Sequence, residues 1–213
     1  MLQYMNQQCF IKFHAEHTLE IACTESEISE LAKWRSELRR EGLVGQDPER
    51  YGGFGFGNLS KKHIKNTHLI TGSQTGHLDK LTPNEFAKII GFDIAKNLVR
   101  SSGMSQPSSE TMTHLAVYKN HPEAGYVFHV HCPEIWLARQ ELKIPTTDLS
   151  AMCGSVEMFY EVQLLLEDRN NYQKGILAMG GHIDGIIAWG QTADEVGFKL
   201  LSILHNRAAS GIM

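Results

Sequence analysis

The sequence has no run of 18 apolar residues, no internal repeat, no CxxC pair among its four cysteines and no excess of basic residues. The missing apolar run argues against a membrane-spanning helix. The net charge of −4 gives no electrostatic reason to expect nucleic acid or an anionic membrane as a partner. The first ten residues have neither the basic nor the apolar part of a signal peptide, so we expect a reducing, cytoplasmic setting.

The composition is that of an ordinary globular protein, with 213 residues of which 42% are hydrophobic and 21% charged. No long linker rich in proline, glycine or serine divides it, so we expect a single domain over residues 1–213. A domain of this size buries enough surface to fold without a structural metal. A metal site in it would therefore serve chemistry rather than folding.

Hydrophobic periodicity and capping signals predict a mixture of helices and strands. We expect helices over 25–41, 107–120, 133–142, 156–169 and 193–209, and a helix start at Pro83. Strands are expected over 68–71, 124–130, 176–179 and 185–189. Residues 86–99 fit either a helix or two strands, because Gly91 interrupts them. The absence of a strict βαβ rhythm favours largely antiparallel strands covered by helices.

The segment His129-Val130-His131 carries the first candidate site. Side chains on a strand alternate between faces, so residues two apart point the same way. Two imidazoles on one face can bind one divalent ion at about 2.0–2.1 Å. The alternative is a pair of exposed or hydrogen-bonded histidines. The position favours a metal, because the pair ends an apolar strand just before Pro133, and functional groups gather at such ends.

A catalytic zinc site has three protein ligands and one open position. We predict His182 as the third ligand, because it follows Gly180 and Gly181 in a turn between two predicted strands. Paired glycines let a backbone approach its neighbours closely. Asp184, two residues later, is the competing ligand, and a plain surface histidine is the alternative without a function.

Glu110 is the candidate general acid or base. It follows Pro107, Ser108 and Ser109 at a predicted helix start, where an acid also favours the helix dipole. Beside a metal's open position, the same carboxylate could shuttle a proton. Hydroxyls and free backbone N–H groups at a helix start bind anions, although Ser108 and Ser109 could equally serve only as N-caps.

Two glycine-rich loops have chemistry suited to an anion. Residues 51–57 hold four glycines, which excludes a stable helix and suits a backbone that lies close to a ligand. Asn58 and Ser60 follow this loop. Thr75 and Gly76 end the second loop, GSQTG, after the strand at 68–71.

Taken in order, these segments resemble the class II aldolase/adducin family. The resemblance rests on GNLS at 57–60, PSSET at 107–111, the histidine pair at 129–131 and IIAWG at 186–190. It extends from about Leu31 to Ala208, which is nearly the whole chain.

The resemblance implies an α/β fold, a three-layer α/β/α sandwich with a central, mainly antiparallel sheet. It implies a homotetramer with active sites between subunits, and a metal-dependent lyase. Such a lyase uses Zn²⁺ or another divalent metal to cleave a carbon–carbon bond in a small, phosphorylated keto-sugar through a metal-stabilised enediolate. On this resemblance, Glu110 transfers a proton and the metal ligands are His129, His131 and His182. The residues that match the family's phosphate site are Asn58, Thr75, Gly76, Ser108 and Ser109.

The sequence departs from the family pattern at four places, one of which is an extra residue in the turn that ends with Thr75 and Gly76. Asp184 stands where the family has a histidine before the glycine, and Gly55 stands where a small hydroxyl residue is frequent. Aldolases of the family use a tyrosine from a neighbouring subunit or the C-terminal tail, and here no tyrosine follows Tyr172. We expect Asp148 to act instead across a subunit interface, as an acid does in the epimerases.

Other activities fit parts of the same pattern. They are an epimerase or dehydratase acting on a sugar phosphate, an aldolase acting on a non-phosphorylated aldehyde or keto acid, and a non-catalytic scaffold as in the adducin branch. Glu110 favours an aldolase over an epimerase, because the epimerases resemble PSSD at that point. The retained His129, His131 and Glu110 argue against a scaffold. We expect a small-molecule substrate, and no nucleic acid or membrane as partner.

Overall fold

A computed structural model describes residues 10–209 of the chain, and its centre is an eight-stranded sheet. The strand order is β1-β7-β6-β5-β4-β8-β10-β9. Only β1 and β7 pair in parallel, and all other neighbours in this sheet are antiparallel. The strands are β1 (His14–Thr18), β4 (Asn58–Lys62), β5 (His68–Thr71), β6 (Phe86–Asp93), β7 (Leu98–Gly103), β8 (Tyr126–His131), β9 (Ile176–Ala178) and β10 (Gly185–Gly190).

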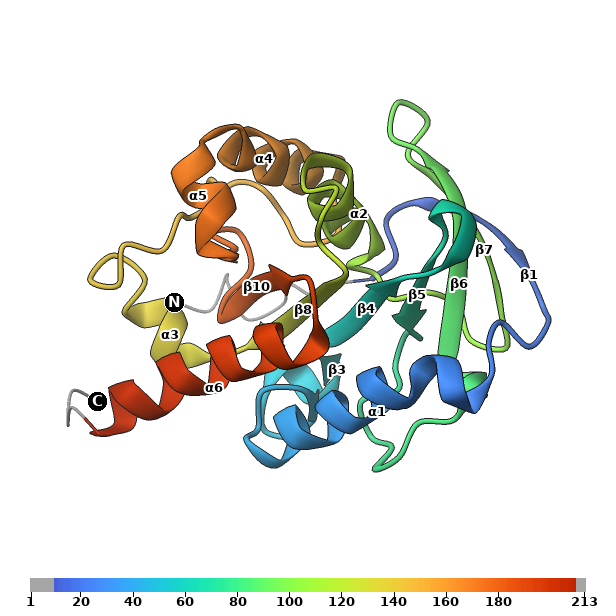
Figure 1. The fold of residues 1–213 in the computed structure, drawn as a ribbon, viewed down its shortest axis with the longest axis horizontal. Coiled ribbons are helices and arrows are strands. Elements are labelled where there is room, and N and C mark those ends of the chain that lie inside the picture. The colour runs from blue at the N-terminus through green and yellow to red at the C-terminus, as the bar shows by residue number, and fades with distance from the viewer. Residues whose placement is uncertain (1–9, 210–213) are drawn as a thin grey trace.

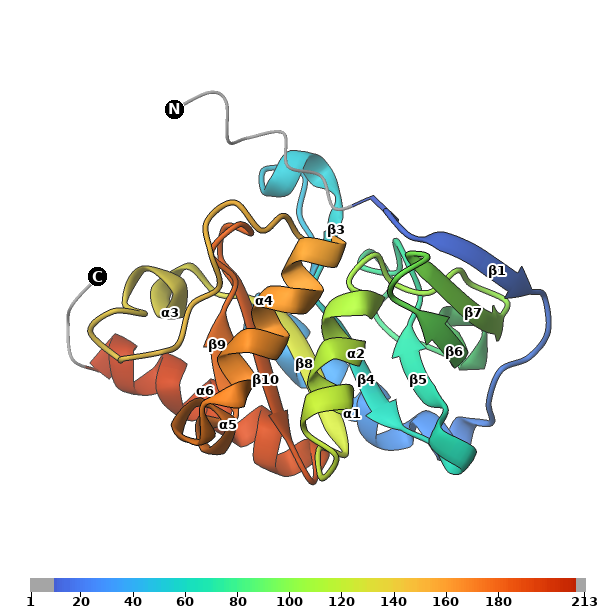
Figure 2. The ribbon, with the colours of Figure 1, turned by 90° about the horizontal axis from the view of Figure 1, so that it is seen from above.

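Helices cover both faces of the sheet, as Figure 1 shows. One face carries α1 (Glu25–Arg40), α3 (Pro133–Leu137) and α6 (Ala193–Ala209), and the other carries α2 (Thr111–Asn120), α4 (Val156–Glu167) and α5 (Arg169–Lys174). Seen from above, α2 and α4 lie side by side (Figure 2). The expected three-layer α/β/α sandwich with a mainly antiparallel sheet is confirmed.

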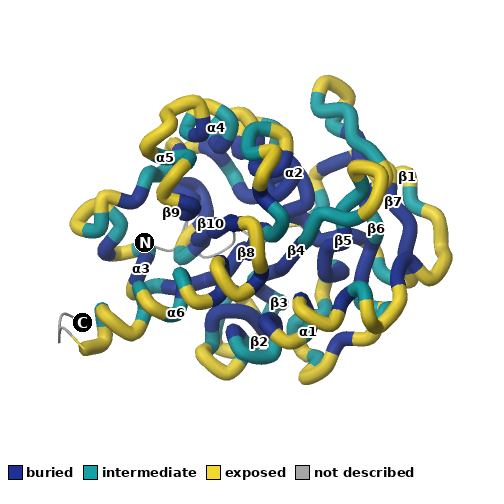
Figure 3. The backbone as a smooth tube through the Cα atoms, viewed as in Figure 1, coloured by how far each residue is buried: buried dark blue, intermediate teal, exposed yellow. Residues whose placement is uncertain are grey.

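The core consists of two apolar clusters, one on each face of the sheet, and the central strands between them are largely buried, whereas the edge strand β1 is mostly exposed (Figure 3). Strand β8 shows how its residues divide between them. Phe128 and Val130 pack in the cluster with α1 and α6, whereas Val127 packs in the cluster with α2 and α4. Because strand side chains alternate, His129 and His131 share the face of Val127. They therefore lie on the side of the sheet where α2 begins.

Most elements expected from the sequence are present, but several differ in extent. The helix expected over 107–120 begins only at Thr111, so Glu110 is its N-cap and does not lie in its first turn. The start at Pro83 gives only a single 3-10 turn (Pro83–Glu85), after which β6 begins. The ambiguous residues 86–99 belong to two strands, β6 and β7, and a register shift between Ile89 and Gly91 marks the irregularity. The helix expected over 133–142 ends at Leu137. Strands β1 and β4 and helix α5 were not predicted.

A small second sheet pairs β2 (Gly45–Gln46) with β3 (Gly55–Phe56). Its connection contains a 3-10 turn, Tyr51–Gly53, and another such turn, Ile64–Asn66, joins β4 to β5. Within residues 10–209, no helix has both the length and the apolar character needed to cross a membrane. The small sheet ends next to β8, and its connecting loop forms one wall of the site described below.

Candidate metal centre

The paired histidines end strand β8 and are both buried, with exposed fractions of 1% for His129 and 3% for His131. His129 Nδ1 lies 3.2 Å from the carbonyl oxygen of Ile186 on the neighbouring strand β10. Donation by Nδ1–H to that carbonyl leaves Nε2 with a free lone pair, which is the tautomer a metal ligand needs.

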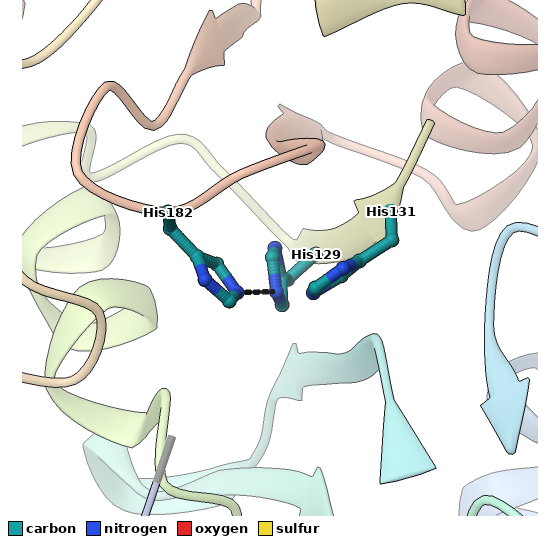
Figure 4. A group of neighbouring side chains, drawn as sticks. All are labelled: His129, His131 and His182. Carbon is teal, nitrogen blue, oxygen red and sulfur yellow. Dashed lines mark hydrogen bonds between the residues drawn. The ribbon is translucent and has the colours of Figure 1, made fainter. Parts of the chain in front are cut away.

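His182 meets this pair from the turn between β9 and β10, and Figure 4 shows the three rings together. The Nε2 atoms of His182 and His129 are 3.3 Å apart. The ring centroid of His131 lies 5.0 Å from that of His129 and 4.6 Å from that of His182. One nitrogen from each ring falls within 4.8 Å of the others, so all three could bind a single ion.

The two glycines before His182 are required by close backbone packing. A Cβ atom on Gly180 would lie 2.1 Å from the carbonyl oxygen of Thr147, and one on Gly181 would lie 1.9 Å from that of Ala151. Segment 147–151 therefore presses directly against the turn. This contact holds the turn over the end of β8 and brings the His182 ring back to the pair.

The carboxylate of Asp184 does not join the histidines. Its Oδ2 accepts a hydrogen bond of 2.8 Å from the Tyr51 hydroxyl, and the residue is half-buried outside the cavity wall. Of the two candidates for the third ligand, the geometry thus brings only His182 to the pair.

Burial keeps the three imidazoles neutral. It lowers the pKa of His129 to about 4, against a weaker opposing effect of the Ile186 carbonyl. Burial and the neighbouring histidines hold the pKa values of His131 and His182 well below the ordinary value of 6.5. Neutral imidazoles are the form that binds metals. The site is therefore ready to accept a cation at neutral pH without first losing protons.

Glu110 lies at the N-cap of α2 and is 1% exposed. Its Oε2 accepts a 2.6 Å hydrogen bond from the Thr113 hydroxyl, and its Oε1 has no hydrogen-bond partner among residues 10–209. Burial raises its pKa from 4.5 to about 7, although Thr113 and the Lys12 ammonium oppose the rise. A carboxyl with this pKa can both hold and release a proton at neutral pH.

Glu110 lies near the histidines. One of its carboxylate oxygens falls within 4.8 Å of a His182 nitrogen and of the Cys153 sulfur. Cys153 is disulfide-bonded, so its sulfur is not available as a thiolate ligand, and this bond does not fit the reducing setting expected from the sequence. The candidate metal-binding group is therefore the three histidines, with Glu110 beside it.

These residues line one cavity of about 260 Å³. Its polar wall contains the five residues that match the family's phosphate site, namely Asn58, Thr75, Gly76, Ser108 and Ser109. Ser60, which the sequence also offered, lies outside this wall, and its hydroxyl is hydrogen-bonded to His114 and Tyr118. The buried Arg35 guanidinium supports part of this wall from behind, through 3.0 Å hydrogen bonds to the carbonyl oxygens of Thr75 and Gly76. Arg39 also donates to the Gly76 carbonyl, at 2.6 Å.

Asp148 lies apart from this cavity. It is exposed, and its Oδ1 accepts hydrogen bonds from the backbone N–H and the hydroxyl of Ser150. These bonds lower its pKa and keep it ionised. Its expected role across a subunit interface stays a prediction.

Sequence reasoning missed several residues of the cavity wall. They are mainly aromatic or lie in the two glycine-rich loops: Phe10, Tyr51, Phe54, Phe56, Ser73, Gln74 and Ile183. The glycine density at 51–57 signalled a backbone close to a ligand, but it did not indicate which side chains turn inward. Tyr51 could be found only from the packing of its ring against His131, with 4.4 Å between ring centroids.

The fold is that of an aldolase-type α/β protein. The model for "Class II Aldolase and Adducin N-terminal domain" matches residues 48–208, and the chain belongs to this family.

Solved structures share the fold at low sequence identity. YgbL from Escherichia coli, described as a putative aldolase/epimerase/decarboxylase, is 15% identical, with a TM-score of 0.65 over 87% of this chain and 88% of its own. An L-fuculose 1-phosphate aldolase is 18% identical, with a TM-score of 0.64 over 90% of this chain and 89% of its own. A sugar-phosphate aldolase from Thermotoga maritima is 17% identical, with a TM-score of 0.61 over 87% and 93%.

Proposed function

We propose that this protein is a metal-dependent lyase that cleaves a carbon–carbon bond in a small keto-sugar phosphate. The observation that carries the proposal is the meeting of three neutral, buried imidazoles beside a buried carboxyl whose pKa is near 7, in one cavity. Family membership and the names of two similar structures, an L-fuculose 1-phosphate aldolase and a sugar-phosphate aldolase, support this class of reaction.

The donor set fits a Zn²⁺ ion. Three imidazoles with an open fourth position are a common arrangement for catalytic zinc. The Nδ1 atom of His131 is buried without a hydrogen-bond partner among residues 10–209, so the ring as described is incompletely satisfied. A bound divalent ion would supply Lewis acidity that stabilises negative charge on the substrate oxygens.

Glu110 transfers the proton to and from the substrate carbon beside the ketone. During cleavage, the hydroxyl beyond the scissile bond loses its proton, its carbon becomes an aldehyde, and the bonding electrons stay on the carbon beside the ketone. The protonated Glu110 carboxyl then delivers its proton to that carbon. A pKa near 7 makes the proton available and allows its return in the direction of synthesis.

The polar wall of the cavity is proposed to hold the phosphate. Ser108 and Ser109 precede α2, where hydroxyls and unpaired backbone N–H groups favour an anion. Asn58 Oδ1 and Glu110 Oε1 are buried acceptors without partners among the described residues, which suits hydroxyl groups of a sugar.

The base that accepts the hydroxyl proton is proposed to be Asp148, acting from a neighbouring subunit of a homotetramer. Its carboxylate is exposed and ionised, and it lies outside the cavity of its own chain. Light scattering would measure the assembly directly. A monomer at assay concentration that turns over substrate would exclude this role for Asp148.

Zinc titration of His129→Ala tests the metal site. In metal-free protein with a competing chelator, the natural chain is expected to bind one Zn²⁺ per subunit, and His129→Ala should lose binding by at least 100-fold, because a directly bound ligand is removed. The exposed His205 on α6 provides a matched control, and His205→Ala should bind as the natural chain does. Equal binding by both variants would overturn the metal assignment.

The zinc-loaded protein would then be assayed on ketose 1-phosphates and on the same sugars without phosphate. NMR should show formation of an aldehyde together with a three-carbon ketone phosphate. Epimers or dehydrated sugars without cleavage would replace the lyase with an epimerase or dehydratase. Equal turnover of the unphosphorylated sugars would contradict the phosphate part of the proposal.

A further inference from the structure

Three polar side chains form a hydrogen-bonded chain behind the histidines. Arg50 Nη2 donates to the Tyr51 hydroxyl at 2.9 Å, and that hydroxyl donates to Asp184 Oδ2 at 2.8 Å. The bond between Tyr51 and Asp184 joins residues 133 positions apart in the sequence. It therefore ties the loop of the small sheet to the turn that carries His182.

Both ends of this bond have an unusual backbone conformation. Tyr51 has a φ of 50° and Asp184 a φ of 64°, in the left-handed region that non-glycine residues seldom adopt. Such conformations persist where the surrounding structure fixes them, and they gather at functional sites. The arrangement of these two side chains is thus built into the fold at a backbone cost.

Each partner also contacts an element that presents a histidine. The Tyr51 ring packs edge-on against His131, with centroids 4.4 Å apart and planes at 70°. The Phe56 ring contacts both of them, with its centroid 5.1 Å from that of Tyr51 and 5.5 Å from that of His131. Asp184 follows His182 by two residues, and its carbonyl oxygen accepts a 2.8 Å hydrogen bond from the backbone N–H of Cys132. The linkage therefore touches both the end of β8 and the turn opposite it.

The Arg50 guanidinium completes the support. It lies over the rings of Tyr51 and Phe56, 5.0 and 4.6 Å from their centroids, and Nη1 donates to the Gly42 carbonyl at 2.9 Å. A rigid stack is thereby anchored to the end of α1 on one side and to the turn of His182 on the other. Residues that fix the orientation of ligands in this way raise the affinity of metal sites.

We propose that Tyr51 and Asp184 are positioning residues, which hold His131 and His182 at the separation that binds one divalent ion. This inference rests on the proposed metal function. It also gives a reason why an acid, rather than a third-ligand histidine, stands directly before Gly185: the carboxylate serves as the acceptor that secures the turn.

The test is zinc affinity, measured by chelator competition with the full chain. Tyr51→Phe keeps the ring against His131 and removes only the hydroxyl, and we expect an affinity loss of about 10- to 100-fold. Asp184→Asn keeps an acceptor oxygen and suits a positive φ, so it should stay within about threefold of the natural chain.

Tyr126→Phe is the matched control, because the Tyr126 hydroxyl also donates to a carboxylate, that of Glu30, away from the cavity. It should leave the zinc affinity unchanged. The unfolding midpoint of each metal-free variant would also be measured. Tyr51→Phe should lose zinc affinity while its metal-free form stays folded under the conditions of the titration. Co²⁺ in place of zinc gives a second readout, because its visible absorption bands should shift and weaken in Tyr51→Phe.

Failure of the positioning role and failure of the metal site itself give different results. If His129→Ala abolishes zinc binding while Tyr51→Phe binds like Tyr126→Phe, the positioning role is wrong and the metal site stands. If His129→Ala binds zinc normally, the metal site itself is wrong. Loss in Tyr51→Phe together with retention in Asp184→Asn supports the inference.

Discussion

Glu110 is the residue whose environment differs most from that of an ordinary carboxyl in water. Its side chain is enclosed between the start of α2 and the backbone at Gly154, and burial raises its pKa to about 7. Between pH 4.5 and 7, the folded chain keeps a proton there that the unfolded chain releases. The contribution of Glu110 to stability is therefore lost as the pH rises through this window, and the buried histidines discussed below oppose it with a slope of the other sign. A carboxyl held at such a cost is expected to have a function.

Glu110→Gln removes the titratable carboxyl, and with it both the free-energy cost of burying an acid and the group that transfers the proton. We expect the metal-free variant to gain stability relative to the natural chain as the pH rises from 5 to 8. The difference between 4.5 and about 7 corresponds to roughly 3 kcal/mol as an upper value. Lyase activity should fall by about 10²- to 10⁴-fold. Urea unfolding at the two pH values and a turnover assay measure the two effects.

Glu157, an exposed acid in the first turn of α4, provides the control. Hydrogen bonds lower its pKa, so Glu157→Gln should show no gain in stability at pH 8. If the free energy of unfolding of Glu110→Gln changed between the two pH values just as that of the natural chain does, the buried and protonated state of Glu110 would be contradicted.

At the scale of elements, the turn between β5 and β6 depends on the absence of a side chain at Gly76. A Cβ there would lie 2.2 Å from the Gly45 carbonyl oxygen and 2.8 Å from the Gly55 Cα, so the turn is packed against both strands of the small sheet. The two arginines of α1 hold the same peptide from behind. The polar wall of the cavity is thus positioned by three elements that are distant in sequence.

Gly76→Ala is expected to destabilise the protein by about 1–3 kcal/mol, because backbone atoms must move to admit the methyl group. Gly91→Ala in β6 is the matched control, since nothing lies within 4 Å of its added Cβ and its φ is not positive. Alanine there should be neutral or slightly stabilising. Urea unfolding midpoints compare the two variants, and equal midpoints would show that the turn is not closely packed.

At the scale of the whole molecule, the buried histidines make stability depend on pH. Burial lowers the pKa values of four buried histidines, namely His114, His129, His131 and His182. It also lowers the pKa of His68, which is partly buried. In the unfolded chain these groups take up protons near pH 6.5, whereas in the folded chain they stay neutral to lower pH. The metal-free protein should therefore lose stability as the pH falls from 6.5 towards 4.

Each such histidine contributes a slope of up to about 1.4 kcal/mol per pH unit. His68→Gln should reduce this slope by up to about 1.4 kcal/mol per pH unit, because one proton fewer is taken up on unfolding. His68 suits this test because its pKa is lowered to about 4 and it lies outside the histidine cluster. Urea unfolding between pH 7.5 and 5 measures the slope, with chelator present so that metal binding does not contribute. A stability independent of pH in this range would show that these rings are already protonated or solvated in the folded chain.

The sequence by itself determined the local features of this protein. Strand alternation places His129 and His131 on one face of β8, and the Pro-Ser-Ser-Glu segment leads directly into α2, because these patterns depend only on neighbouring residues. The mixed, antiparallel α/β fold could also be predicted, both from the spacing of its elements and from the resemblance to a family. The metal, the substrate and the assembly stay predictions.

Only the tertiary structure decided which residue of the β9–β10 turn faces the histidine pair. His182 and Asp184 are two residues apart, so no local pattern separates them. The contacts of Gly180 and Gly181 with segment 147–151 and the bond from Tyr51 to Asp184 orient the turn, and these partners come from distant parts of the chain. The same is true of the raised pKa of Glu110, because burial is a property of the packed molecule and not of the segment that contains the residue.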